Sequence, residues 1–254
     1  MLLTIDIGNT NTVLGVFDGE KLDRSWRIKT DSRTTADELA LTFRGLLADH
    51  EITGISACST VPAVLRELRV MLADYYPDVP VVLVEPGVRT GVGVLTDNPK
   101  EVGTDRVCNT AAAHHLTHAP CIVVDFGTST NFDVVSERGE FLGGALAPGI
   151  EISLDALAAR AAALRKVDLA VPRSPIGKNT VESLQSGILY GFAGQVDGMV
   201  RRLSKALVPD DPDRVEVIAT GGLATLVIDH CETVTRFEPE LTLLGLRLIY
   251  DRNV

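Results

Sequence analysis

The sequence predicts an α/β protein in which one plan, a mixed β-sheet with helices packed against it, occurs twice along the chain. Residues 2–86 read as strand, strand, strand, helix, strand, helix, strand, which is the order of a mixed sheet flanked by helices. Residues 118–144 repeat the opening of the chain, with an apolar strand, an aspartate, a glycine among hydroxyl and amide side chains, and two further strands. We therefore expect two duplicated domains, residues 1–117 and residues 118–254.

Local signals define the elements of the first half. The Asp18-Gly19 turn separates the second apolar strand from the third. Thr35 and Glu38 have the spacing of a capping box, and Pro62 suits the first turn of a helix. In chain order, we expect strands at residues 2–7, 12–19 and 21–30, a helix at 36–50, a strand at 52–60, a helix at 62–76, a strand at 79–86 and a helix at 104–116.

The second half begins with the repeat of the opening strands. The Asp-Phe-Gly-Thr-Ser stretch at residues 125–129 aligns with Asp-Ile-Gly-Asn-Thr at residues 6–10. The distance between the two copies is far longer than the roughly 20–50 residues of a solenoid repeat, so it indicates a duplicated domain. We expect three strands within 118–144, a long helix at 179–207, a strand at 215–220, a turn at Gly221-Gly222 and a helix at 241–251.

Composition and charge restrict the class of protein. Of 254 residues, 45% are hydrophobic and 23% are charged, as is typical of a globular chain. The formal net charge of −10 disfavours nucleic acid as a partner. No run is long enough to span a membrane, and the first ten residues lack the basic start of a signal peptide. We expect a cytoplasmic protein with buried free thiols at Cys58, Cys108, Cys121 and Cys231.

The two Asp-x-Gly turns have two interpretations. Taken singly, each is well explained as a hairpin whose Thr and Asn side chains bond their own backbone. If the two halves face each other, however, both turns converge on one cleft, where small side chains let backbone N–H groups approach phosphate oxygens. The carboxylates would repel the phosphates unless a cation lay between them. Asp6 is therefore a candidate ligand of Mg²⁺, directly or through water.

Other nucleotide and metal motifs do not fit. Gly177-Lys178 is followed by Asn179 instead of Ser or Thr, so it is not a Walker A motif. The stretch "GVGVLT" is an incomplete dinucleotide-binding fingerprint. The five histidines show no metal-ligand spacing with acidic neighbours, and we do not expect zinc chemistry.

Five motifs, in order between residue 4 and residue 222, resemble those of the type III pantothenate kinase family. They are "DIGNTNT", "NPKEVGTDR", "DFGTSTNFDVV", "GGALAPG" and "ATGG". This family is part of the actin, sugar kinase and Hsp70 ATPase superfamily. The resemblance therefore implies two duplicated ribonuclease H-like (actin-like ATPase) domains.

The resemblance implies ATP-dependent phosphorylation of pantothenate to 4'-phosphopantothenate, the first step of coenzyme A biosynthesis. It implies Mg²⁺, a monovalent cation (K⁺ or NH₄⁺) held by Asp125, and a homodimer in which Thr180 reaches the substrate from the partner subunit. It makes Asp105 the general base. The ATP-binding residues it implies are Asp6, Ile7, Gly8, Asn9, Thr10, Asn11, Thr12, Val13 and Thr128, and the substrate-binding residues are Gly103, Thr104, Asp105, Arg106 and Thr180.

The "GTDR" stretch suits phosphoryl transfer chemically. Asp105 can accept the proton of an alcohol, and Arg106 can pair with a carboxylate as a planar fork. Out of context, the same pair is a surface ion pair early in a helix. Two residues depart from the family pattern: Thr96 stands where an aromatic is common, and Asn131 stands where a threonine is usual.

Two further functions stay open from the residues alone. One is a different small-molecule kinase of the same superfamily, and the other is a non-catalytic regulator that binds nucleotide. A stripe of glycines in the long helix indicates close packing at a dimer interface, and it consists of Gly187, Gly191, Gly194 and Gly198.

Overall fold

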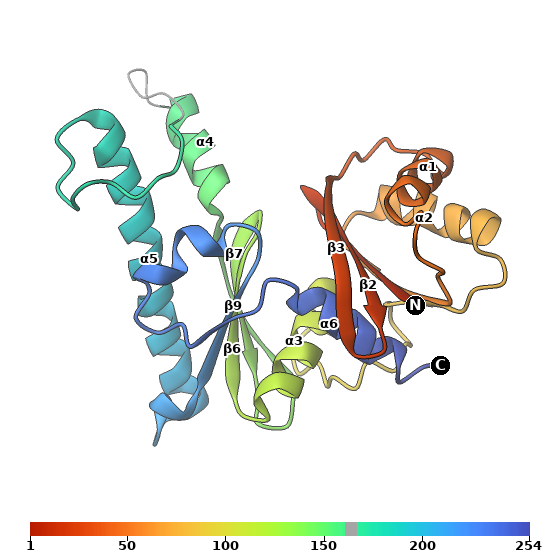
Figure 1. Cartoon of the computed structure of the whole chain (residues 1–254). Helices are drawn as coiled ribbons and strands as arrows, with labels where there is room; N and C mark the ends of the chain where they lie inside the picture. Colours follow the sequence, from red (N-terminus) through yellow and green to blue (C-terminus); the bar gives the residue numbers. More distant parts are fainter. Residues whose placement is uncertain (161–166) are drawn as a thin grey trace. The chain divides into compact units, whose positions relative to one another are not determined.

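The computed structural model describes residues 1–160 and 167–254, which form two five-stranded mixed sheets with the same topology (Figure 1). The first sheet has the strand order β3-β2-β1-β4-β5, and the second has β8-β7-β6-β9-β10 when read in the same direction. In each sheet the three strands that come first in sequence form antiparallel pairs. The two strands that come last in sequence run parallel to the central strand, which is β1 in the first sheet and β6 in the second. The predicted fold class, a duplicated α/β domain, is confirmed.

The strands are β1 (Leu2–Ile7), β2 (Asn11–Asp18), β3 (Lys21–Lys29), β4 (Gly54–Ser59), β5 (Val81–Leu83), β6 (Cys121–Phe126), β7 (Ser129–Val135), β8 (Phe141–Pro148), β9 (Glu216–Thr220) and β10 (Arg236–Phe237). The α-helices are α1 (Ala36–Leu46), α2 (Pro62–Tyr75), α3 (Thr104–Thr117), α4 (Ile150–Arg160), α5 (Thr180–Leu207) and α6 (Leu241–Tyr250). Short 3₁₀ helices lie at Pro99–Glu101, Pro212–Arg214, Ala224–Leu226 and Ile228–His230. No helix within the described ranges has both the length and the apolar composition needed to cross a bilayer.

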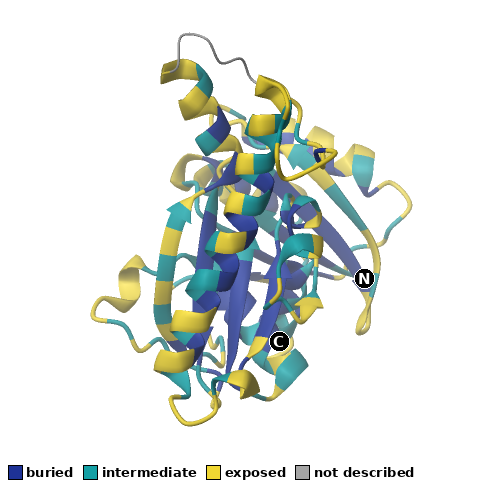
Figure 2. Cartoon of the chain, turned by 90° about the vertical axis from the view of Figure 1, so that its left-hand side faces the viewer, coloured by how far each residue is buried: buried dark blue, intermediate teal, exposed yellow. Residues whose placement is uncertain are grey.

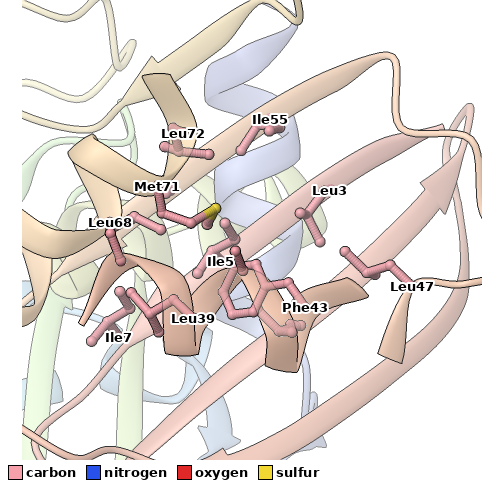
Figure 3. Packing of buried hydrophobic residues seen from close by; sticks show 14 of the residues in the cluster. Leu3, Ile5, Ile7, Leu39, Phe43, Leu47, Ile55, Leu68, Met71 and Leu72 are labelled. Carbon is pink, nitrogen blue, oxygen red and sulfur yellow. The ribbon is translucent and has the colours of Figure 1, made fainter. Parts of the chain in front are cut away.

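The two faces of the first sheet are covered by different helices. Side chains at odd positions of β1, such as Ile5, pack against α1 and α2, with Phe43 and Met71 fully buried between them (Figure 3). We call this the α1/α2 face. The opposite face packs against α6 through Leu243 and Leu246 and against α3, and we call it the α6 face. Because residues alternate along a strand, Asp6 of β1 projects from the α6 face.

The helix and strand signals read from the sequence are mostly confirmed. Thr35 and Glu38 form the capping box, with the Thr35 N–H donating to Glu38 Oε2 at 2.9 Å. Helix α1 ends at Leu46 instead of continuing to residue 50, since the Leu47 N–H already closes the last turn on Phe43. The strand expected at 79–86 pairs only over Val81–Leu83. Figure 2 shows buried residues concentrated in the strands, while the helices also carry intermediate and exposed residues.

The compact units are interleaved along the chain, unlike a single division between residues 117 and 118. The first unit comprises Met1–Val92, Asp97–Ala112 and Leu241–Val254, and the second comprises Gly93–Thr96 and Ala113–Glu240. Helix α6 therefore joins the first unit, where it packs on β1 and β4 (Figure 1). Its apolar residues are needed there because α1 and α2 cover only one face of the first sheet.

A close backbone contact joins α6 to α3. A Cβ added at Gly245 of α6 would overlap the carbonyl group of Cys108 in α3. We predict that Gly245→Ala lowers the free energy of unfolding by about 1–3 kcal/mol, because two helix backbones must separate. Chemical denaturation measures this change.

Gly45→Ala is the matched control for this prediction. Gly45 lies in α1, and an added Cβ meets no atom within 4 Å. We expect this variant to be more stable than the parent by roughly 0.5–1 kcal/mol, because alanine loses less backbone entropy in a helix. A Gly245→Ala variant as stable as the parent would contradict the close contact.

Candidate active site

Asp6 lies one residue before the end of β1, the central strand of the first sheet. It pairs in register with Val13 of β2 on one side and Cys58 of β4 on the other. The turn after it is tight, because the Gly8 N–H donates to the Asn11 carbonyl at 3.0 Å. A Cβ on Gly8 would lie 3.1 Å from that carbonyl oxygen, so a small residue suits this position. The first hairpin therefore places a carboxylate directly below a turn of small and amide residues.

The surroundings of Asp6 disfavour its charge. Burial and the nearby charge of Asp105 raise the pKa of Asp6 to about 7, while a hydrogen bond from Cys58 and the charge of Arg27 lower it. The Cys58 thiol donates to Asp6 Oδ1 at 3.4 Å. A divalent cation would offset the cost of burying this charge by neutralising the carboxylate.

Asp105 lies in the first turn of helix α3, and its charge acts on Asp6 although the two residues are far apart in the sequence. The Thr104 hydroxyl donates to the carbonyl of Ser59 at 3.4 Å, which ties the start of α3 to the end of β4. Asp105 Oδ1 accepts the Arg106 N–H at 2.9 Å, and it approaches Gly103 so closely that a Cβ there would overlap it. Burial raises the pKa of Asp105, and the hydrogen bond and charge of Arg106 oppose that rise.

Two thiols lie beneath these carboxylates. Cys58 and Cys108 are buried and free, and the hydrogen bond between their side chains is the largest cause that raises the pKa of Cys58 well above its usual value. Thiols in such surroundings stay neutral and unreactive. The predicted free thiols are confirmed, but Cys231 is only partly buried. The role of Cys58 as a hydrogen-bond donor to Asp6 was missed, because it follows from the parallel register of β1 with β4 and not from any local motif.

The second unit repeats the hairpin with different neighbours. Asp125 of β6 pairs in register with Asn131 of β7 and Thr220 of β9. Gly221, at a φ of 94°, packs its backbone against the Asp125 carboxylate, where a side chain would collide. The Ser129 hydroxyl and Asn131 Oδ1 are hydrogen-bonded at 2.6 Å. The asparagine that departs from the family pattern thus fixes the turn through its side chain.

Three other predicted residues lie in the second unit. Thr128 is exposed at the tip of the β6–β7 turn, and its carbonyl accepts the Gly149 N–H at 3.2 Å. Thr180 is the first residue of α5 and is exposed. The hydroxyl of Thr96 is buried without a hydrogen-bond partner in the described part of the chain, and its methyl group lies beside Gly143 of β8. Thr96 therefore borders the "GGALAPG" strand.

The donor set around Asp6 fits magnesium better than a metal held by protein alone. Within residues 1–160 and 167–254, no group of three or more His, Cys, Asp or Glu side chains is arranged to hold a metal ion. Mg²⁺ in nucleotide sites is held by one or two carboxylates together with phosphates and water. Asp6 supplies one such carboxylate, and the pKa that burial raises to about 7 would be offset by a cation.

Comparison with solved structures defines the class of fold. The inorganic polyphosphate/ATP-glucomannokinase of Arthrobacter sp. strain KM superimposes with a TM-score of 0.54 at 15% identity, covering 100% of this chain and 99% of that one. The duplicated sheets are thus those of the sugar kinase and actin-like ATPase fold.

Sequence relatives define the family. The family model for type III pantothenate kinase matches residues 2–202. The type III pantothenate kinase of Frankia alni is 65% identical over 254 residues, and that of Salinispora arenicola is 66% identical over 256 residues; in both cases the match covers 100% of each chain. The chain belongs to the type III pantothenate kinase family.

The partly buried charge of Asp6 should cost stability. Its folded pKa of about 7 exceeds the ordinary value of 3.8, so stability falls as pH rises through that interval. We predict that Asp6→Asn, in the absence of metal and nucleotide, raises the melting temperature at pH 8 by about 2–4 °C, corresponding to about 1 kcal/mol. The gain should shrink toward pH 4, where the parent carboxyl is neutral.

Asp18→Asn serves as the control, because Asp18 is an exposed carboxylate at the end of β2. We expect it to leave the melting temperature within about 1 °C of the parent at both pH values. If Asp6→Asn melted below the parent at pH 8, the ionised carboxylate would stabilise the fold, and its charge would not be disfavoured by its surroundings.

Proposed function

We propose that Asp105 is the general base of the pantothenate kinase reaction that the family membership gives to this chain. In that reaction the γ-phosphate of ATP is transferred to the terminal hydroxyl of pantothenate, which forms 4'-phosphopantothenate for coenzyme A synthesis. The observation that carries this proposal is that the first turn of α3, which contains Asp105, is tied to the end of β4, the strand beside Asp6, by the hydrogen bond from Thr104 to Ser59. Asp6 lies under the turn that would hold phosphates, and the charge of Asp105 acts on it.

We assign the phosphates of ATP to residues 6–13, with Thr128 contributing from the second unit. The turn at residues 8–11 offers backbone N–H groups with little side-chain bulk, which suits close approach of phosphate oxygens. Asp6 would hold Mg²⁺, directly or through water. When bound, Mg²⁺ neutralises charge on the transferring phosphate.

The residues of the "GTDR" stretch have different roles in binding and activating pantothenate, the phosphate acceptor. Asp105 accepts the proton of the attacking hydroxyl, and the raised pKa that burial gives it makes it a stronger base than an exposed aspartate. Arg106 pairs with the pantothenate carboxylate as a planar fork. Gly103 and Thr104 keep the backbone close to the substrate, with Thr104 anchored to the end of β4.

The remaining roles are assigned to the second unit and to a second subunit. Asp125 would hold the monovalent cation, K⁺ or NH₄⁺. Thr180 would reach pantothenate of the partner subunit in a homodimer. The glycine stripe of α5 supports the dimer, since Gly187, Gly191 and Gly194 are exposed and an added Cβ at each meets no atom within 4 Å. The free thiols agree with the reducing cytoplasm, where we place the reaction.

A coupled assay of ADP release tests the activity. With ATP, Mg²⁺ and K⁺ present, we predict turnover that requires pantothenate and falls when K⁺ is replaced by a large organic cation. Turnover with another acceptor but not with pantothenate would identify a different kinase. Nucleotide binding without turnover of any acceptor would indicate a regulator.

Asp105→Asn separates the base from the rest of the site. We predict that it lowers kcat by about 10²–10⁴-fold while nucleotide affinity is kept, because only proton transfer is lost. Asp97→Asn is the control, since Asp97 is an exposed carboxylate in the segment before α3 and should retain parental kcat. Parental turnover in Asp105→Asn would remove Asp105 from the mechanism.

A further inference from the structure

Strand β3 carries two cations on the same sheet face as Asp6. Arg27 lies opposite Val13, which in turn lies opposite Asp6, and Lys29 lies opposite Asn11 at the start of β2. Residues directly opposite each other in an antiparallel pair project from the same face. Arg27 and Lys29 therefore extend from the α6 face, in line with Asp6 and with the turn that follows it.

The neighbours of these cations on β3 confirm which face they occupy. Trp26 and Ile28 alternate with them and pack against the core of the α1/α2 face. Arg24 projects from the same face as Trp26, because the two residues are two positions apart on the strand. Its guanidinium lies over the Trp26 ring, 5.2 Å from the ring centroid. Strand β3 thus divides its basic side chains, with Arg24 on one face and Arg27 and Lys29 on the other.

Arg27 and Lys29 are not neutralised by the protein. Both are exposed, and neither forms an ion pair with a carboxylate among the residues that the structure describes, in a chain with 34 acidic side chains. Other exposed arginines do have such partners, for example Arg33 with Asp31 and Arg66 with Glu67. The two cations are therefore available to an anionic ligand.

The reach of Arg27 brings its charge to the site. Neighbouring strands are about 4.8 Å apart, so the β3 backbone runs roughly 10 Å from β1, a distance that an arginine side chain can shorten considerably. Burial and Asp105 raise the pKa of Asp6, whereas the Cys58 hydrogen bond and the charge of Arg27 lower it. The guanidinium is thus close enough to act on a carboxylate two strands away.

The proposed reaction requires more positive charge than the assigned residues supply. Asp6, Asp105, the triphosphate and the carboxylate of pantothenate all carry negative charge in one region. The positive charges assigned so far are Mg²⁺ and Arg106, together with the monovalent cation that is assigned to the second unit. A guanidinium is suited to the remaining need, because its planar fork pairs with phosphate oxygens.

We propose that Arg27, with Lys29 beside it, binds the phosphate chain of ATP from the β3 side of the turn at residues 8–12. The assignment adds a phosphate-binding element outside the five sequence motifs. It rests on the proposed function, since it takes residues 6–13 as the phosphate site.

The test compares Arg27→Met with Arg24→Met. The two variants remove the same charge from the same strand, three positions apart but on opposite faces. We predict that Arg27→Met raises KM for MgATP about tenfold, as expected for a lost charge-assisted contact, and leaves KM for pantothenate near the parental value. Calorimetric binding of a non-hydrolysable ATP analogue should weaken by a similar factor. Arg24→Met should retain both constants, and Arg27→Lys should fall between parent and Arg27→Met.

Several outcomes would overturn the inference. These are an unchanged affinity for the analogue in Arg27→Met, an equal loss in Arg24→Met, or an effect confined to KM for pantothenate. Circular dichroism checks that each variant is folded, and Lys29→Met provides a second variant in which a smaller loss of nucleotide affinity is expected. The parent enzyme in the same assay keeps the two proposals apart. If the parent does not turn over pantothenate, the proposed function fails, whereas a competent parent with an unaffected Arg27→Met refutes this inference alone.

Discussion

A carboxylate held where its charge is disfavoured is the feature on which the rest of the first unit depends. Asp6 is fixed by its place in the central strand, by the thiol of Cys58 and by the nearness of Asp105. Helix α3 must begin at the end of β4 for the charge of Asp105 to act on Asp6. Helix α6 covers the rest of the same sheet face. Burial and the charge of Asp105 raise the pKa of Asp6 to about 7, so its surroundings disfavour the ionised form. A cation and the phosphates it accompanies would complete the arrangement.

The duplication uses one hairpin for two different environments. Asp6 and Asp125 occupy equivalent positions in sheets of identical topology. Burial and the second carboxylate, Asp105, raise the pKa of Asp6 against the opposing hydrogen bond from the Cys58 thiol, and a divalent cation would offset that rise. Asp125 instead borders the Gly221 backbone, where an added Cβ would overlap its carboxylate. Equivalent backbones therefore present aspartates with different chemistry, and we connect this difference with the two different cations that we assign to them.

The sequence predicted those features that depend on local patterns. The capping box at Thr35, the strand at residues 2–7 that carries Asp6 and the helix that begins at Thr104 are each encoded within a few residues, and the structure contains all three. The hydrogen bond from Cys58 depends on the pairing of β1 with β4, two strands far apart in sequence, and the face of Arg27 depends on the register of β2 with β3. A one-residue change of register would turn either side chain to the opposite face of the sheet. The return of α6 to the first sheet likewise follows from a face left uncovered by α1 and α2, which no stretch of sequence displays.

The most direct test is a crystal structure of the protein with Mg²⁺, a non-hydrolysable ATP analogue and pantothenate. We expect the metal next to Asp6, bound directly or through one water, phosphate oxygens against the turn at residues 8–12, and the pantothenate hydroxyl within hydrogen-bond reach of Asp105. A triphosphate bound elsewhere, with neither the metal nor any phosphate oxygen next to Asp6, would contradict the account.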